Sequence, residues 1–124
     1  IEEYNKRPRR KEIGARAEKA VEAQYLEDWR QKVERIGNLN YPEAAKGRLY
    51  GNLLLYVEIK ADGSLERVEV QRSSGHKILD EAAMRIVRMA APYGSFSAEL
   101  KRQTDIVAFA RTWVFARGDQ LRSE

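Results

Sequence analysis

The sequence contains no cysteine, and this absence excludes several kinds of chemistry. Without cysteine the chain forms no disulfide, carries out no thiol catalysis and holds no metal ion through sulfur. Histidine occurs once, no glycine-rich phosphate loop is present, and no group of carboxylates has the spacing of a metal site. We therefore expect a protein that is not an enzyme and that uses no cofactor and no metal ion.

The single histidine, His76, lies among serine and aspartate residues, which raises the possibility of a catalytic triad. Its neighbours are Ser73, Ser74 and Asp80, and all four residues fall within eight positions at the predicted start of a helix. Serine and aspartate at such a place commonly accept hydrogen bonds from the free N–H groups of the first helical turn. We interpret residues 73–80 as a capping loop.

Long apolar segments are also absent. No run of 18 apolar residues occurs, so we predict no membrane-spanning helix. The first residues, Ile-Glu-Glu, include neither Met nor an apolar core, so we predict no signal peptide and expect the sequence to be a piece of a longer protein. The 124 residues suffice for one domain. We place it at residues 25–124, after a basic helical arm or linker end at residues 1–24.

The positive charge is concentrated near the N-terminus. Residues 1–20 hold seven Lys and Arg against four Glu, whereas the rest of the chain has a net charge of only +1. A domain that reads nucleic acid normally carries its positive charge on the folded surface, so we expect no nucleic-acid partner. We interpret the cluster from Lys6 to Lys11 as a solvated linker end; nucleic acid, anionic lipid or an acidic protein face are the alternatives.

Two helices are predicted from the spacing of apolar residues. Steps of four and three predict a helix over residues 9–36, with Gly37 just after its end. The second half of this helix carries the bulky residues and is expected to pack on the domain. A second apolar stripe predicts a helix over residues 77–91, which Pro92 ends. Residues 43–46 are expected to form one short helical turn.

Three strands are predicted from apolar runs and turn signals. Residues 49–60 are nearly continuously apolar, and Asp62-Gly63 predicts a hairpin to an alternating strand over residues 65–73. Residues 106–116 form the third β-prone run. The remaining segments are residues 92–104, expected to form a loop, and the polar residues after Arg117, expected to be frayed.

These elements predict an α+β fold of the pattern α-β-β-α-β. The strand at 49–60 is the most apolar and belongs in the centre of a three-stranded antiparallel sheet, ordered 2-1-3 along the chain and packed on helices. The strand at 106–116 is then an edge about 37 Å long that only Arg111 interrupts. Edges this long and apolar are normally protected, so we expect an extended peptide or a second copy to add to it. The chain's own C-terminal tail is an alternative cover.

The order of these segments along the chain resembles that in the C-terminal periplasmic domain of TonB-type energy transducers. The likeness covers residues 25–117, and the earlier helix resembles a variant subgroup in which an extended helix precedes a Tyr-Pro element. The matching segments are Tyr41-Pro42, Gly51-Asn-Leu-Leu-Leu-Tyr-Val-Glu-Ile-Lys-Ala-Asp-Gly-Ser-Leu65, Val68-Glu-Val-Gln-Arg-Ser-Ser-Gly75, Leu79-Asp-Glu-Ala-Ala-Met-Arg-Ile-Val87 and Arg111-Thr-Trp-Val-Phe115.

The resemblance implies a periplasmic domain of a protein anchored in the inner membrane, whose anchor lies outside this sequence. Its partners would be an ExbB–ExbD-like, proton-driven motor and the TonB box of outer-membrane transporters for siderophore-iron, haem or cobalamin. The box would add as a strand beside the last strand, with contacts near Tyr-Pro. By position, these binding residues are Asn38, Leu39, Asn40, Tyr41, Pro42, Ile106, Val107, Ala108, Phe109, Ala110, Arg111, Thr112, Trp113, Val114 and Phe115.

Two alternatives remain open beside this interpretation. A TolA-like domain, which couples the cell envelope by binding periplasmic proteins, has a related strand and helix plan but usually carries a disulfide. A small nucleic-acid-binding αβ domain would need aromatic and basic residues on the exposed sheet face, where the strand at 65–73 offers Arg67, Glu69 and Gln71. A homodimer through the last strand is compatible with any of these functions.

Overall fold

The apolar run at residues 51–60 forms the centre of the sheet in the computed structural model, which describes residues 7–14, 16–17 and 19–124. This strand is β2 (Gly51–Lys60), and its alternate residues Leu53, Leu55 and Val57 are fully buried on one face. It pairs antiparallel with β3 (Leu65–Arg72) on one side and with β4 (Ile106–Ala116) on the other. The predicted neighbours of the central strand are therefore present.

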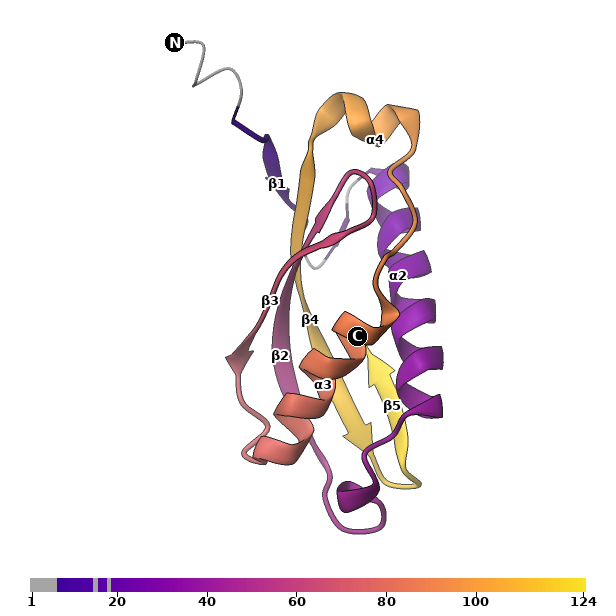
Figure 1. The fold of residues 1–124 in the computed structure, drawn as a ribbon, viewed down its shortest axis with the longest axis vertical. Coiled ribbons are helices and arrows are strands. Elements are labelled where there is room, and N and C mark those ends of the chain that lie inside the picture. Colours follow the sequence, from indigo (N-terminus) through magenta and orange to yellow (C-terminus); the bar gives the residue numbers. More distant parts are fainter. Residues whose placement is uncertain (1–6, 15, 18) are drawn as a thin grey trace.

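The prediction of a three-stranded, fully antiparallel sheet is wrong, because two further strands cover the outer edge of β4. Within the described residues the sheet has five strands. β1 (Arg10–Glu12) pairs with the start of β4 in parallel, and β5 (Gln120–Ser123) pairs with its end in antiparallel orientation (Figure 1). Both strands are too short and too polar to produce an apolar pattern in the sequence. The edge that we expected to be open is covered by the chain itself.

The helices lie together on one face of the sheet (Figure 1). They are α2 (Ala20–Leu39), α3 (Lys77–Ala90) and the short α4 (Ala98–Gln103), with a single 3₁₀ turn, η1 (Glu43–Ala45), before β2. The predicted stripe of α3 is buried as expected: Leu79, Ala82, Ala83, Ile86, Val87 and Ala90. The opposite face of the sheet has no helix over it among the described residues.

Three boundaries differ from the prediction. The first helix starts at Ala20 and not at Arg9, and Arg10–Glu12, within the predicted helix, pair instead with β4. Gly37 lies inside α2 and does not end it; a Cβ atom there would overlap the side chain of Leu121, so glycine lets β5 approach the helix closely. The predicted loop at 92–104 contains α4, and the tail expected to be frayed contains β5.

The aromatic side chains of α2 and β4 join the helix layer to the sheet. Trp29 is 2% exposed, and its ring lies 4.9 Å from that of Phe109 and 6.2 Å from that of Trp113, between ring centroids. The prediction that the second half of the helix packs on the domain is thus confirmed. Phe109 and Trp113 are both buried on the core face of β4.

The loop before α3 is organised by Asp80. The carboxylate accepts hydrogen bonds from the Ser73 hydroxyl, from the Ser74 hydroxyl at 2.7 Å and from the Ser74 backbone N–H at 2.9 Å. Both serine hydroxyls therefore donate directly to the carboxylate, and His76 takes part through its backbone. The loop is structural, but it does not cap the helix as we interpreted: the N-cap residue is His76, and no side-chain hydrogen bond caps the helix there.

We predict that Asp80→Asn lowers the free energy of unfolding at pH 7 by about 1 kcal/mol. Burial raises the pKa of Asp80, but the hydrogen bonds from Ser73 and Ser74 outweigh burial and hold that pKa below its ordinary value. A depressed pKa stabilises the fold above the unfolded-state pKa and loses this contribution as the pH falls through the folded-state value. The difference between the two proteins in urea unfolding should accordingly shrink below about pH 4.

The exposed neighbour provides the control, since Glu81→Gln removes a carboxylate of the same helix without touching the loop. It should change stability by less than about 0.5 kcal/mol. An Asp80→Asn variant as stable as the parent at pH 7 would show that the loop does not depend on the charge of this carboxylate.

Candidate functional site

The outer edge of β4 presents backbone groups from alternate residues. The N–H of Ile106 donates to the Arg9 carbonyl at 2.9 Å, and the Ala108 carbonyl accepts from the N–H of Ile13 at 2.8 Å. Further along, Thr112 exchanges two backbone hydrogen bonds with Glu124, at 2.9 and 2.7 Å. Strands of either direction therefore bind to this edge, a parallel one at its start and an antiparallel one at its end.

A gap separates the two covering strands at Ala110. The alternation of the strand points the Ala110 backbone N–H and C=O outward, as it does for Ala108 and Thr112. In the described part of the chain, the register of β1 ends at Ala108 and the backbone pairing of the C-terminal strand ends at Thr112. A hollow beside the gap is lined by Ile13, Tyr56 and Ala110, among others. Ala110 is thus the point of β4 that an added strand reaches first.

The basic residues Arg9–Lys11, which we interpreted as a linker end, are paired with three carboxylates from separate parts of the fold. Arg9 forms an ion pair with Asp105 at 3.1 Å and Arg10 one with Glu58 at 3.4 Å. Lys11 forms a third ion pair, with Glu22 of α2. We call Glu22, Glu58 and Asp105 the acidic slot.

The members of the acidic slot differ in burial. Glu22 is 4% exposed and Glu58 is 3% exposed, whereas Asp105 is half-exposed. Glu58 also accepts a hydrogen bond of 2.5 Å from the Tyr56 hydroxyl; burial and then this hydrogen bond raise the pKa of Tyr56 to about 12. Hydrogen bonds from the Arg9 side chain and backbone hold the pKa of Asp105 below its usual value.

The acidic slot is not evident from the sequence. The available signal was weak: Glu58 is a single acid in the apolar run of β2, and Arg9–Lys11 are three consecutive bases. Nothing in the sequence showed that these two features would meet, because Arg10 and Glu58 are 48 positions apart.

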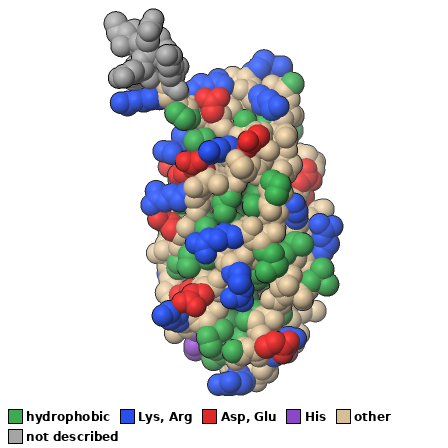
Figure 2. Space-filling model, in the orientation of Figure 1, with side chains coloured by type: hydrophobic (Ala, Val, Ile, Leu, Met, Phe, Trp, Pro, Cys, Tyr) green, Lys and Arg blue, Asp and Glu red, His purple; other side chains and the backbone are tan. Residues whose placement is uncertain are grey.

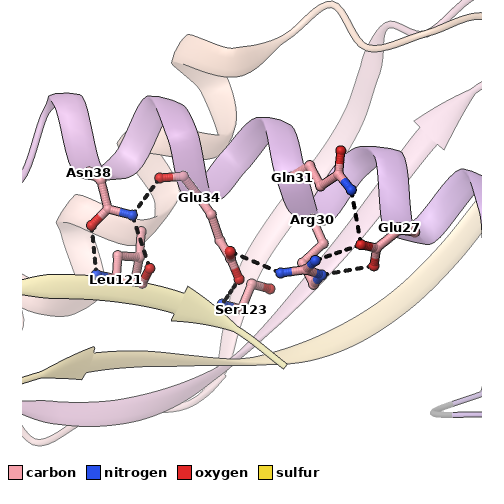
Figure 3. Close-up of polar contacts among 7 residues, drawn as sticks. All are labelled: Glu27, Arg30, Gln31, Glu34, Asn38, Leu121 and Ser123. Atoms are coloured by element: carbon pink, nitrogen blue, oxygen red, sulfur yellow. Dashed lines mark hydrogen bonds and ion pairs between the residues drawn. The ribbon is translucent and has the colours of Figure 1, made fainter.

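Polar side chains of α2 hold the C-terminal strand in place (Figure 3). The Asn38 side chain accepts from the N–H of Leu121 at 2.9 Å and donates to its carbonyl at 3.1 Å. One turn earlier, the Glu34 carboxylate accepts from the N–H of Ser123 at 2.8 Å and from Arg30 at 2.9 Å. Leu121 is itself buried in the core. β5 is therefore fixed by both packing and hydrogen bonds.

The predicted Tyr-Pro segment lies at the end of α2, close to the end of β4. Tyr41 is buried, and its ring packs on that of Phe115 with 5.6 Å between centroids. Pro42 is buried, Leu39 is 76% exposed, and the Asn40 side chain donates to a helix carbonyl. The two parts of the predicted binding set therefore meet at this end of the sheet, and Leu39 offers an exposed apolar side chain to a partner there.

The predicted residues of β4 divide between two faces. On the face toward the helices lie Val107, Phe109, Arg111, Trp113 and Phe115, and burial lowers the pKa of the Arg111 guanidinium. The alternate residues, from Ile106 to Val114, lie on the other face, where Ala110, Thr112 and Val114 are partly exposed. Contact with a partner at β4 would therefore be made by the backbone and these small side chains.

Charges of both signs are interspersed on the face drawn in Figure 2. No three or more metal-ligating side chains come together in the described ranges. Among those residues, no helix has both the length and the apolar character needed to cross a membrane.

A comparison with known protein families finds a match to the central part of the chain. The family model described as "Gram-negative bacterial TonB protein C-terminal" matches residues 37–115. The match includes β2, β3, α3 and α4 and ends one residue before the end of β4, so β1, most of α2 and β5 lie outside it. No curated protein and no solved structure matches the chain.

Proposed function

Because the chain belongs to the TonB C-terminal family of Gram-negative bacteria, we propose that it binds the TonB box of outer-membrane transporters by strand addition at β4. Through a membrane anchor outside this sequence, it would take up energy from a proton-driven, ExbB–ExbD-like motor and pass it to the transporter. The cargo would be siderophore-iron, haem or cobalamin. In this proposal the domain binds and transmits force, and it catalyses no reaction.

The outer edge of β4 is the observation that supports this proposal. Its backbone pairs with a parallel strand at one end and with an antiparallel strand at the other, and the groups of Ala110 between them point outward. Backbone pairing needs little from the side chains of the ligand. An edge of this kind suits a domain that serves several transporters.

Strand addition also suits the transmission of force. Each backbone hydrogen bond contributes only about 1 kcal/mol at equilibrium. A pull along the strand axis loads many such bonds together, because they lie perpendicular to the pull in an antiparallel pair and slanted to it in a parallel one. A complex that forms and dissociates readily would therefore still bear a load while the motor acts.

We predict that an NMR titration with a TonB-box peptide from a transporter of the same cell shifts resonances of residues 106–115 and 38–42. Ala110→Pro should weaken this binding at least about tenfold, since proline removes the N–H that points into the gap. Ala110→Ser keeps both the N–H and the small size of the side chain and provides the matched control, with affinity close to that of the parent. Equal affinity in a folded Ala110→Pro variant would place the binding site elsewhere.

The same NMR titration distinguishes the proposed function from a TolA-like one. If no box peptide from the cell shifts any resonance at millimolar concentration, the proposal fails. A TolA-like role in coupling envelope proteins would then be the better explanation of the fold.

A further inference from the structure

We propose that Arg9–Lys11 acts as an intramolecular ligand of the β4 edge. It occupies the acidic slot, which is suited to a basic, extended segment, and it has to leave before another strand can pair with Ile106–Ala108. This inference rests on the proposed function for the identity of the competing strand. It adds a self-blocking step to the same site.

The first observation that supports this inference is the charge complementarity between Arg9–Lys11 and the acidic slot. Three consecutive bases face three carboxylates supplied by α2, by β2 and by the residue before β4. The Arg9 guanidinium also donates to the carbonyls of Lys101 and Arg102, at 2.9 and 2.8 Å. Elements far apart in the sequence therefore converge on one short basic strand, whereas a chance surface contact would involve isolated pairs.

Burial of the slot explains why a basic strand belongs there. Glu22 and Glu58 are both almost fully buried, and a buried carboxylate is costly without a cation beside it. Lys11 and Arg10 provide these cations. With β1 in place the slot therefore favours a basic segment, and a competing strand has to bind tightly enough to offset the loss of these ion pairs.

Differences between β1 and β5 show which strand can be displaced. β1 has three residues, and the Arg9–Asp105 ion pair beside it is half-exposed on both sides, so water and salt weaken it. Among the described residues of 7–14, only Ile13, just after the strand, enters the core. β5, in contrast, is held by buried Leu121 and by hydrogen bonds to α2. Exchange is therefore expected at the start of β4.

A covalent lock tests the blocking step directly. Glu12 and Ala108 are register partners, and adjacent strands lie about 4.8 Å apart, which a disulfide spans. Because the chain has no native cysteine, the double variant Glu12→Cys, Ala108→Cys forms one defined disulfide. The oxidised form should bind the TonB-box peptide at least about tenfold more weakly than the reduced form of the same protein.

Release of β1 should have the opposite effect. The double variant Arg9→Glu, Lys11→Glu places like charges opposite the acidic slot and should tighten binding of the box peptide about tenfold. Arg7→Glu with Arg85→Glu makes the same change of net charge at two exposed residues that form no ion pair within the described ranges. This control should bind as the parent does.

A peptide taken from the chain itself tests whether the acidic slot binds basic segments. Its sequence is Arg-Pro-Arg-Arg-Lys-Glu-Ile-Gly, from residues 7–14. Added to the released variant, it should shift resonances of Ile106–Ala108, and the box peptide should displace it. The same peptide with Glu in place of its third, fourth and fifth residues, which are Arg9–Lys11 in the chain, should not bind.

The outcomes separate the two proposals. Equal binding of the box peptide to the oxidised and reduced lock overturns the blocking role of β1 and leaves the proposed function intact. Binding of the self-peptide to the released variant, together with no binding of any box peptide to any form, supports the slot and rejects the proposed function. No binding of the self-peptide to the released variant overturns the slot itself.

Discussion

Trp113→Ala is expected to lower the free energy of unfolding by about 3–5 kcal/mol. The Trp113 side chain is completely buried on the core face of β4, and its ring lies 6.2 Å from that of Trp29 between centroids. Truncation removes the contact between sheet and α2 and leaves a cavity that the surrounding aromatic rings cannot fill. Guanidinium or urea unfolding, monitored by circular dichroism, measures the loss.

A loss of this size is a large part of the free energy of unfolding of a small domain, which is typically about 5–15 kcal/mol. The variant should therefore be studied at low temperature, where a folded population remains. Leu39→Ala is the control, because Leu39 is 76% exposed and its truncation should change stability by less than about 0.5 kcal/mol. A loss below 1 kcal/mol for Trp113→Ala would show that β4 presents its other face to the helices.

The elements predicted from the sequence are those with a long apolar pattern of their own. β2 has a nearly continuous run, β3 alternates, and α3 carries a stripe with helical spacing. The turn at Asp62-Gly63 then fixes which strands are neighbours. Each of these signals is local, so no knowledge of the remaining chain was needed to read it.

The start of α2 was predicted wrongly because local preference was the only guide there. Residues 9–19 are rich in Arg, Lys, Glu and Ala, which favour helix. Within this segment, Arg9–Ile13 pair with the edge of β4, almost a hundred residues later in the chain, and this pairing outweighs a helical preference of a few tenths of a kcal/mol per residue. Tertiary contact decides such segments, and composition does not reveal it.

β5 was missed for a related reason. It has four residues, and only Leu121 and Ser123 are buried. A pattern with a period of two cannot be recognised in so short and polar a segment. Its stability comes from Asn38 and Glu34 of α2, which supply hydrogen bonds that no local rule predicts.

The candidate site contains one feature that the sequence indicated and others that it did not. The length and apolar character of residues 106–116 correctly indicated that this strand needs a neighbour. The C-terminal tail, which the sequence left open as a possible cover, supplies one neighbour as β5; that Arg10–Glu12 supplies a second neighbour, lying against buried carboxylates, followed only from the structure. The peptide-binding residues assigned by resemblance remain a prediction, now with the partly exposed Ala110 at the gap between the two covering strands.

Gly63→Ala is the second change with a large expected effect, and we predict a loss of roughly 2–4 kcal/mol in the free energy of unfolding. Gly63 has a φ of +90°, in a region that side chains disfavour. A Cβ atom there would also overlap the backbone carbonyl of Tyr93, whose N–H donates to the Gly63 carbonyl at 2.7 Å. The hairpin and the residues after α3 would have to separate.

Gly75→Ala separates the cost of backbone strain from the cost of the collision with Tyr93. Gly75 has a φ of +88°, almost the same as Gly63, but a Cβ atom there would meet nothing within 4 Å. Its substitution should therefore cost only the backbone strain, about 1–2 kcal/mol. The difference between the two variants in urea unfolding measures the collision with Tyr93. If both glycines cost the same, the close contact between the hairpin turn and Tyr93 does not contribute to stability, and backbone strain alone explains the glycine at position 63.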